Sequence, residues 1–300
     1  MRQRGKFVDL SPPNPYRLNG CGGACDGLVK DRRSAATDVF GTNPHFPHGE
    51  TRRGMQVPAI ELRQLVKCYG KRRALDDLTV TVASGGVVGF LGVNGAGKST
   101  TMRILAGYLA PTSGTATVCG IDVAADSLAV RECVGYLPEN NPLYPEMRVT
   151  EYLRFRARLK GVSRGVRAGA VERVVRSCRL DDASGRLIGQ LSKGYRQRVG
   201  LADCLLTEAP LLILDEPMAG LDPNQARQTR QLIAEIGRTR TVFLSTHALG
   251  DVESICREAV IIHRGRLVAV DTPQGLLSRG TRQRFRLEIL GEAETVRRAI

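Results

Sequence analysis

The amino-acid sequence predicts an α/β fold organised around one strand, one glycine-rich loop and one helix. The strand is the short apolar run 86–91, and the helix begins in the run 101–107. Between them, residues 92–100 read Gly-Val-Asn-Gly-Ala-Gly-Lys-Ser-Thr, which matches a glycine, four residues and then Gly-Lys-Ser. This pattern between a strand and a helix is typical of a loop that binds phosphate groups.

The chemistry of the loop follows from its residue types. Its glycines let the backbone take positive φ and come close to a ligand. Its N–H groups lie at a helix N-terminus, which favours an anion. We expect Lys98 to bridge the β- and γ-phosphates and the Ser99 hydroxyl to hold Mg²⁺. Glycine-rich turns also occur without ligands, but the full pattern in this context favours a nucleotide site.

Further strands are expected on both sides of the loop. Apolar residues at 60–66 and the alternating run 78–82 indicate two strands before it, hence a small antiparallel layer beside the nucleotide. Tyr69, between those strands, is either a platform for adenine or an ordinary strand-end tyrosine. Residues 150–187 have a helical pattern, with Thr150 as the expected N-cap.

A second group of chemical residues follows two apolar strands. The run 211–214 ends in Asp215 and Glu216, and the run 241–246 is followed by His247. In phosphate-loop proteins we expect the strand beside the loop to present an aspartate to Mg²⁺. A neighbouring carboxylate can act as general base for the attacking water. A lone histidine at a strand end is often structural, but here it is expected to contact the γ-phosphate.

Five motifs together resemble one family. They are the phosphate loop 92–100, the run Leu-Ser-Lys-Gly-Tyr at 191–195, the strand and acidic pair 211–216, the loop that contains Asp222, and His247. In this order and spacing they resemble the ATP-binding subunit of an ABC transporter, over about residues 57–275. The run 135–144 and the Lys-Gly-Tyr sequence resemble the gliding-motility or multidrug-exporter type.

The resemblance implies a fold and a list of site residues. The expected fold is a P-loop NTPase with a RecA-like core, an antiparallel β subdomain and an inserted helical subdomain at about 140–205. The expected catalytic residues are Glu216, His247 and Lys98, and the Mg²⁺ ligands are Ser99, Glu139 and Asp215. The residues expected to bind ATP are Tyr69, Gly92, Asn94, Gly95, Ala96, Gly97, Lys98, Ser99, Thr100, Glu139, Ser192, Gly194 and Asp215.

Two positions depart from the family pattern. Lys193 and Tyr195 stand where the family's Leu-Ser-Gly-Gly-Gln has glycine and glutamine, whereas Ser192 and Gly194 are kept. Glu139 replaces the usual glutamine. A carboxylate there can bind Mg²⁺, a hard cation that prefers oxygen ligands, but it also adds negative charge beside the γ-phosphate.

The resemblance also implies partners and a location. ATP would be bound between two head-to-tail subunits, which are expected to be identical. Ser192 and Gly194 of one subunit would contact the γ-phosphate of the ATP bound by the phosphate loop of the other. A separate integral-membrane permease would be driven to export its substrate. The subunit would lie in the cytoplasm, on the inner face of the cell membrane. The alternative is a soluble ABC-type ATPase that acts on ribosomes or nucleic acid.

Composition sets the remaining expectations. A hydrophobic fraction of 42% and a charged fraction of 25% are those of a globular protein. The net charge of +14 is spread along the chain without a basic block, so no nucleic-acid partner is expected. The eight cysteines lack zinc-site spacing and are expected to be reduced.

Two terminal segments fall outside the predicted ATP-binding domain at 58–280. Residues 1–57 are rich in Gly and Pro and are expected to be a disordered extension, unless translation begins at Met55. Residues 281–300 are expected to begin a C-terminal accessory segment that is cut short.

Overall fold

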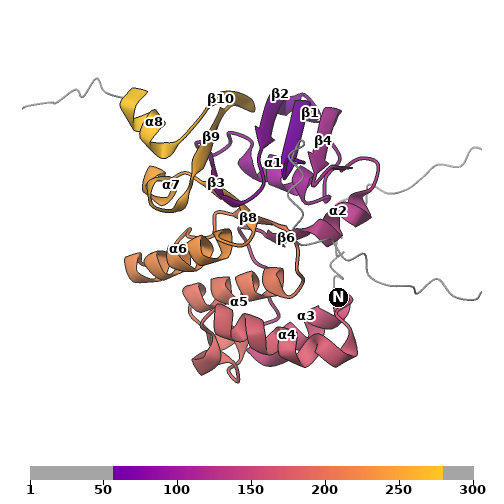
Figure 1. Ribbon diagram of the computed structural model, residues 1–300, viewed down its shortest axis with the longest axis vertical. Coiled ribbons are helices and arrows are strands. Elements are labelled where there is room, and N and C mark those ends of the chain that lie inside the picture. Colours follow the sequence, from indigo (N-terminus) through magenta and orange to yellow (C-terminus); the bar gives the residue numbers. More distant parts are fainter. Residues whose placement is uncertain (1–56, 280–300) are drawn as a thin grey trace, which may run out of the picture. The chain divides into compact units, whose positions relative to one another are not determined.

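The computed structural model describes residues 57–279 of the chain (Figure 1). The predicted N-terminal extension, except for its last residue, and the predicted accessory segment 281–300 lie outside the described residues. Within them the chain forms two sheets and eight α-helices, together with two short 3₁₀ turns, Asp181–Ala183 and Ile188–Gln190.

The first sheet is antiparallel and has four strands. Its strands are β1 (Ile60–Tyr69), β2 (Arg72–Val82), β4 (Ser113–Val118) and β5 (Ile121–Asp122). Their order is β2-β1-β4-β5, and every neighbouring pair is antiparallel. The turn between β1 and β2 uses Gly70 at φ 57°, a conformation that glycine adopts at little cost. The antiparallel layer predicted from the alternating apolar pattern is therefore present.

The second sheet contains the strand before the phosphate loop. Its strands are β3 (Gly86–Leu91), β6 (Val134–Leu137), β7 (Leu211–Asp215), β8 (Thr241–Thr246), β9 (Glu258–His263) and β10 (Arg266–Asp271). They are ordered β10-β9-β3-β8-β7-β6, and only the β9–β10 pair is antiparallel. The central strands read as continuous apolar runs because both faces of a parallel sheet are covered.

Alternate side chains of these strands enter two different cores. The helices are α1 (Lys98–Leu105), α2 (Ser127–Cys133), α3 (Val149–Leu159), α4 (Arg164–Ser177), α5 (Lys193–Leu205), α6 (Pro223–Gly237), α7 (Leu249–Ile255) and α8 (Pro273–Arg279). Val88 and Phe90 of β3 pack with the antiparallel sheet and with helices α1 and α2, whereas Val87 and Leu91 pack with the core of helices α3 to α6. Figure 1 shows these two sets of elements on opposite sides of the sheet.

The order of the strands corrects one expectation. The strand that ends in Asp215 was expected beside the strand of the phosphate loop, but β8 lies between β3 and β7. The apolar pattern shows that a strand is buried and does not show which neighbour it pairs with. Asp215 still reaches the loop's side of the sheet, because the carboxyl ends of parallel strands meet at one edge.

Helices α3, α4 and α5 lie in the range where the helical insert was expected. They pack on one another around a common core that includes Leu153, Val174 and Leu201. The start of α3 differs from the prediction. Its first residue is Val149, and the Thr150 hydroxyl donates to the Ser184 carbonyl (2.6 Å) instead of capping the helix.

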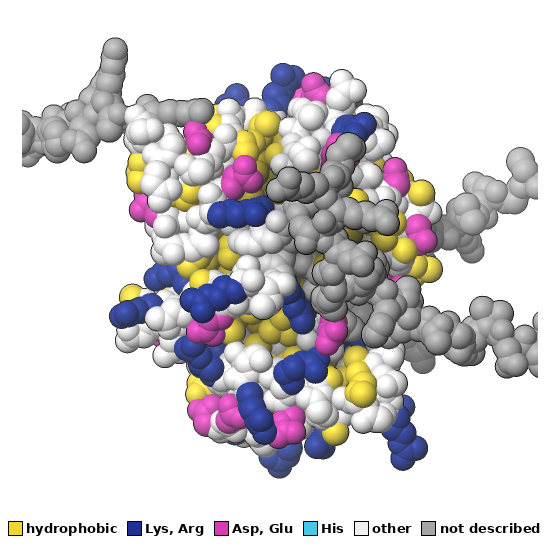
Figure 2. Space-filling view, viewed as in Figure 1, with side chains coloured by type: hydrophobic (Ala, Val, Ile, Leu, Met, Phe, Trp, Pro, Cys, Tyr) yellow, Lys and Arg dark blue, Asp and Glu magenta, His cyan; other side chains and the backbone are white. Residues whose placement is uncertain are grey.

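Two surface properties bear on possible partners. Lys and Arg side chains are spread over the face seen in Figure 2, with acidic side chains between them. In residues 57–279, no helix is both long and apolar enough to cross a membrane.

Candidate nucleotide-binding site

The phosphate loop joins β3 to α1 and is packed tightly on its protein side. A Cβ atom at Gly92 would lie 2.7 Å from the carbonyl oxygen of Ile262, and one at Gly97 would lie 2.8 Å from that of Ala74. Gly97 also has φ 112° immediately before α1, which L side chains rarely adopt. In contrast, a Cβ at Gly95 would meet nothing within 4 Å, and Asn94 beside it is exposed. The loop is therefore held from behind and open at its middle.

Lys98 begins α1, and its ammonium group is buried at the base of the loop. The Nζ atom donates to the Gly92 carbonyl at 2.7 Å and lies 3.2 Å from Oε1 of Glu216. A buried ammonium group is stable only when it is paired and hydrogen-bonded. These two contacts bring the predicted phosphate-binding lysine and the predicted base together, although 118 positions separate them in the sequence.

Asp215 and Glu216 lie where β7 ends. Asp215 is buried and accepts a hydrogen bond from the Ser245 hydroxyl at 2.6 Å. The same hydroxyl oxygen accepts from the backbone N–H of Glu216 at 2.8 Å. Glu216 has φ 49°, so the chain turns sharply there, and such strained residues cluster at functional sites. Burial raises the pKa of the nearby Tyr136 to about 12, with the charge of Asp215 acting in the same direction.

Ser245 is a site residue that the sequence prediction did not include. Its position as the residue paired with Asp215 in the β7–β8 register places its hydroxyl between the two carboxylate-bearing residues. The available signal was its place two residues before His247 at the end of an apolar strand.

His247 follows β8 and contacts the same carboxylate as Lys98. Its Nδ1 atom lies 3.0 Å from Oε2 of Glu216. The imidazole is 57% exposed, whereas the Glu216 side chain is only 10% exposed. One oxygen of Glu216 thus faces Lys98 and the other faces His247, with the open side of the histidine toward solvent.

The predicted Mg²⁺ ligands are oxygen donors at the same end of the sheet. Ser99 is partly buried in the first turn of α1, beside the predicted ATP-binding residue Thr100; Asp215 ends β7, and Glu139 is exposed two residues after β6. Among residues 57–279 there is no group of three or more His, Cys, Asp or Glu side chains that could hold a metal alone. Such a sparse set of hard donors fits Mg²⁺, which usually combines one or two carboxylates with phosphate and water oxygens.

Ser192 and Gly194 lie at a different place, at the start of α5. The Ser192 hydroxyl caps this helix by accepting from the backbone N–H of Tyr195 at 3.4 Å. A Cβ atom at Gly194 would lie 2.6 Å from the Gln225 side chain, so this end of α5 packs on the first turn of α6. Within the described part of the chain, Ser192 makes no hydrogen bond to the phosphate loop or to Glu216. The structure does not bring these two groups of predicted residues together.

Tyr69 is exposed at the end of β1. Its ring lies 5.5 Å from Nζ of Lys67, measured to the ring centroid. An exposed ring at this position leaves both the adenine-platform and the strand-end interpretations open.

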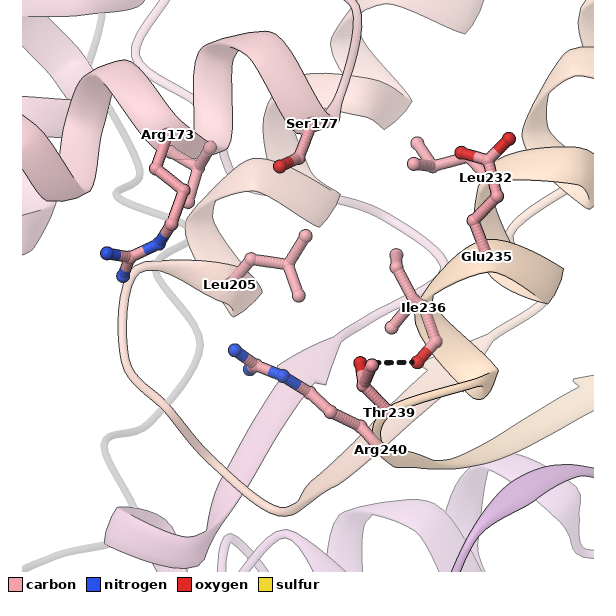
Figure 3. Close-up of a pocket in the computed structure, with 9 residues that line it drawn as sticks. Arg173, Ser177, Leu205, Leu232, Glu235, Ile236, Thr239 and Arg240 are labelled. Carbon is pink, nitrogen blue, oxygen red and sulfur yellow. Dashed lines mark hydrogen bonds between the residues drawn. The ribbon is translucent and has the colours of Figure 1, made fainter.

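A cavity of about 270 Å³ lies elsewhere, between α4, α5 and α6. In Figure 3, Arg173 and Arg240 lie on one side of it and Glu235 on the other. None of the predicted site residues lines this cavity, so it is separate from the candidate nucleotide site.

Comparisons with known proteins agree with this geometry. The model of the ABC transporter family matches residues 75–219. The Nod factor export ATP-binding protein I of Paraburkholderia xenovorans (strain LB400) is 35% identical over 229 residues, which are 75% of this chain and 74% of that protein. The bacitracin transport ATP-binding protein BcrA of Bacillus licheniformis is 35% identical over 70% of this chain and 68% of its own length.

Solved structures give the same result. A structure described as the ATP-binding subunit of an ABC transporter is 32% identical, has a TM-score of 0.66, and is matched over 74% of this chain and 92% of its own. For cbiO1 of Clostridium perfringens, part of the ABC transporter complex cbiONQ, the TM-score is 0.68 and the identity 25%, with the same coverage of both chains.

The chain therefore belongs to the ABC transporter family and has the ABC ATPase fold. It is an ATP-binding, ATP-hydrolysing transporter subunit, as the five motifs predicted, and the relatives do not favour an ATPase of ribosomes or nucleic acid. The gliding-motility type is not tested by these relatives and stays a prediction.

Proposed function

We propose that ATP is bound and hydrolysed at the edge where β3, β7 and β8 end, and that this energises export by a separate membrane permease. The observation that carries the proposal is the position of the Glu216 carboxylate, 3.2 Å from Nζ of Lys98 and 3.0 Å from Nδ1 of His247. These contacts support the proposal because they place the proposed base next to the proposed phosphate-binding cation and the imidazole.

The contacts suggest how the residues work. When phosphate groups occupy the loop, Lys98 is expected to exchange its contact with Glu216 for phosphate oxygens. The Glu216 carboxylate can then accept a proton from the water that attacks the γ-phosphate, which is general-base catalysis. His247 keeps one ring nitrogen on Glu216 and turns its exposed side toward the γ-phosphate. The backbone N–H groups of residues 92–100 stabilise the phosphate charge.

Mg²⁺ would be held by Ser99, Asp215 and Glu139. Bound there, the ion neutralises charge that develops on the phosphate oxygens. Tyr69 would stack on adenine. Ser245 fixes the carboxylate of Asp215 through its 2.6 Å hydrogen bond, which keeps that oxygen in one orientation.

A second, identical copy would supply Ser192 and Gly194 to this phosphate loop. Support comes from the exposure of Ser192 at the N-terminus of the 13-residue α5, an orientation that favours an anion. Among residues 57–279, the phosphate loop of the same chain makes no hydrogen bond to Ser192. A head-to-tail arrangement of two copies would give each phosphate loop the missing donors.

The permease is proposed to contact the loop that follows Glu139. That loop packs on α5, because the Asn141 side chain donates to the carbonyl of Arg196 (3.4 Å) and fills the space beside Gly200. Tyr144 in the same loop is 43% exposed, although its ring lies 5.9 Å from that of Tyr152, centroid to centroid. An exposed aromatic ring on a well-supported loop suits a protein contact. The chain would then lie on the inner face of the cell membrane.

Co-purification tests this assignment. Tagged chain, purified from membranes, should bring with it a permease of several membrane spans, and the pair should hydrolyse ATP with Mg²⁺ but not with EDTA in excess. Association with ribosomes or DNA in place of a permease would contradict the proposed function.

A further inference from the structure

We infer that Asp251 is a positioning residue for His247, held by Arg230 and acting through Thr246. The inference rests on the proposed function, in which His247 meets the γ-phosphate. It concerns the residues that fix where His247 lies, and within residues 57–279 none of the three has a side-chain hydrogen bond or ion pair to the phosphate loop.

The turn that carries His247 has little packing to hold it. Residues 247–250 are all exposed. Within residues 57–279, the polar contact of the His247 side chain is the one from its Nδ1 to Glu216. The position of the imidazole therefore depends on the backbone on either side of it.

Both sides of that backbone are tied to one hydroxyl group. Thr246, directly before His247, is buried, and its Oγ1 accepts a hydrogen bond from the backbone N–H of Ala248 at 3.0 Å. The same Oγ1 donates its proton to Oδ2 of Asp251, also at 3.0 Å. The hydroxyl bridges across His247, and Asp251 sets the direction of the hydroxyl proton.

Asp251 is held in turn by a second helix. Its side chain is only 8% exposed, and its Oδ1 accepts from Nη1 of Arg230 at 2.7 Å. A buried carboxylate keeps its charge only when it is paired and hydrogen-bonded, and here the two oxygens have one partner each. Arg230 therefore fixes the carboxylate, and the carboxylate fixes Thr246.

Arg230 belongs to α6, the helix that begins beside the exposed end of α5. Asp222 caps α6 by accepting from the backbone N–H of Gln225 at 2.9 Å, and Gln225 packs against Gly194. Arg230 lies on the same helix, about two turns after the cap residue Asp222. One helix thus contacts both the residues offered to the second copy and the carboxylate that positions His247.

Substitutions of Thr246 separate positioning from folding. Thr246→Val keeps the shape and the Arg230–Asp251 ion pair but removes the hydroxyl bridge, and Thr246→Ser restores it. In the full-length chain we expect Thr246→Val to lower kcat for ATP about 10- to 100-fold, the range for a misplaced catalytic group. ATP affinity should change less than about twofold, and Thr246→Ser should recover most of the rate. Asp251→Asn should behave like Thr246→Val.

The matched control is on the same helix. Glu235→Gln removes the other ion pair of α6, which joins Glu235 to Nη2 of Arg179 at 2.9 Å, and it should leave kcat unchanged. An equal loss of kcat in Glu235→Gln would overturn the inference, because general loosening of α6 would then explain it. The inference would also be overturned if Thr246→Val kept the wild-type kcat while His247→Ala had a lowered kcat.

An NMR measurement tests the positioning even if His247 proves not to be catalytic. The ring nitrogen signals of His247 are identified as those that disappear in His247→Ala. In the absence of nucleotide, they should shift in Thr246→Val and return to the wild-type positions in Thr246→Ser. Unchanged His247 signals in Thr246→Val would overturn the inference. If the signals shift while His247→Ala keeps full activity, positioning is upheld, and it is the assigned role of His247 that fails.

Discussion

The phosphate-loop edge and the exposed end of α5 carry the two halves of the predicted site, and they differ in how complete they are. At the first, Glu216 contacts both Lys98 and His247, and the side chains of Lys98 and Glu216 are only 7% and 10% exposed. At the second, Ser192 is exposed, and within residues 57–279 its hydroxyl is engaged only in capping its own helix. Under the proposed function, this difference means that one chain brings the hydrolytic residues together by itself, whereas the exposed Ser192 would meet a phosphate only on a second copy.

The largest expected effect is at the phosphate-loop edge. Glu216→Gln removes the base but keeps the size and the hydrogen-bonding oxygen of the side chain. We expect kcat for ATP to fall about 100- to 10,000-fold, the usual contribution of a general base, with ATP affinity kept. A steady-state ATPase assay at saturating ATP measures this. Turnover at the wild-type rate would show that Glu216 is not the base.

The next effect separates nucleotide binding from hydrolysis. Lys98→Ala removes the cation at the base of the loop and should weaken ATP binding about 100-fold, because hydrogen bonds to charged groups contribute up to about 3 kcal/mol. Isothermal titration measures the change. Lys71→Ala, in the exposed β1–β2 turn, is the matched control and should bind normally. Tight ATP retention by Lys98→Ala would contradict the assignment of the loop.

At the outward-facing half we expect a smaller effect that depends on charge. Ser192→Asp and Ser192→Asn both keep the helix cap, because all three residue types are good caps. Only the aspartate would repel the γ-phosphate bound by a second copy, lowering kcat about tenfold below that of the asparagine variant. ATPase assays at equal chain concentration compare them. Equal rates would mean that Ser192 faces no phosphate.

The smallest effect is expected at Tyr69. Loss of one aromatic platform in Tyr69→Ala should weaken ATP binding about fivefold, at the weak end of base–aromatic stacking, because the ring is exposed. Tyr69→Phe keeps the ring and should bind like the wild type. Competition between ATP and a fluorescent ATP analogue measures both. An unchanged Tyr69→Ala would leave the strand-end interpretation.

Sequence patterns predicted the fold class and the central site residues because those depend on local chemistry. The glycines of the loop, the apolar runs and the acidic pair each require their residue types at fixed spacings. The patterns did not predict that β8 lies between β3 and β7, since strand pairing is decided by packing across the whole sheet. They also missed Ser245, Asp251 and Arg230, whose partners are 5 to 30 residues away and meet only after folding.

The start of α3 shows the same limit on a smaller scale. Thr150 has the right residue type for a cap, but its hydroxyl bonds to Ser184. The backbone N–H of Arg148 donates instead to the Glu151 side chain at 3.3 Å, so the helix begins at Val149. A tertiary contact thus displaces a local preference, and the sequence window around residue 150 contains no sign of it.

The mass of the Glu216→Gln chain in solution tests the two-half account most directly. Multi-angle light scattering should give 32.6 kDa without nucleotide and twice that mass with saturating ATP, because bound ATP would join the phosphate loop of one copy to Ser192 of the other. A chain that binds ATP and still has a mass of 32.6 kDa would contradict the account. The phosphate loop would then bind ATP without any contact to α5 of a second copy.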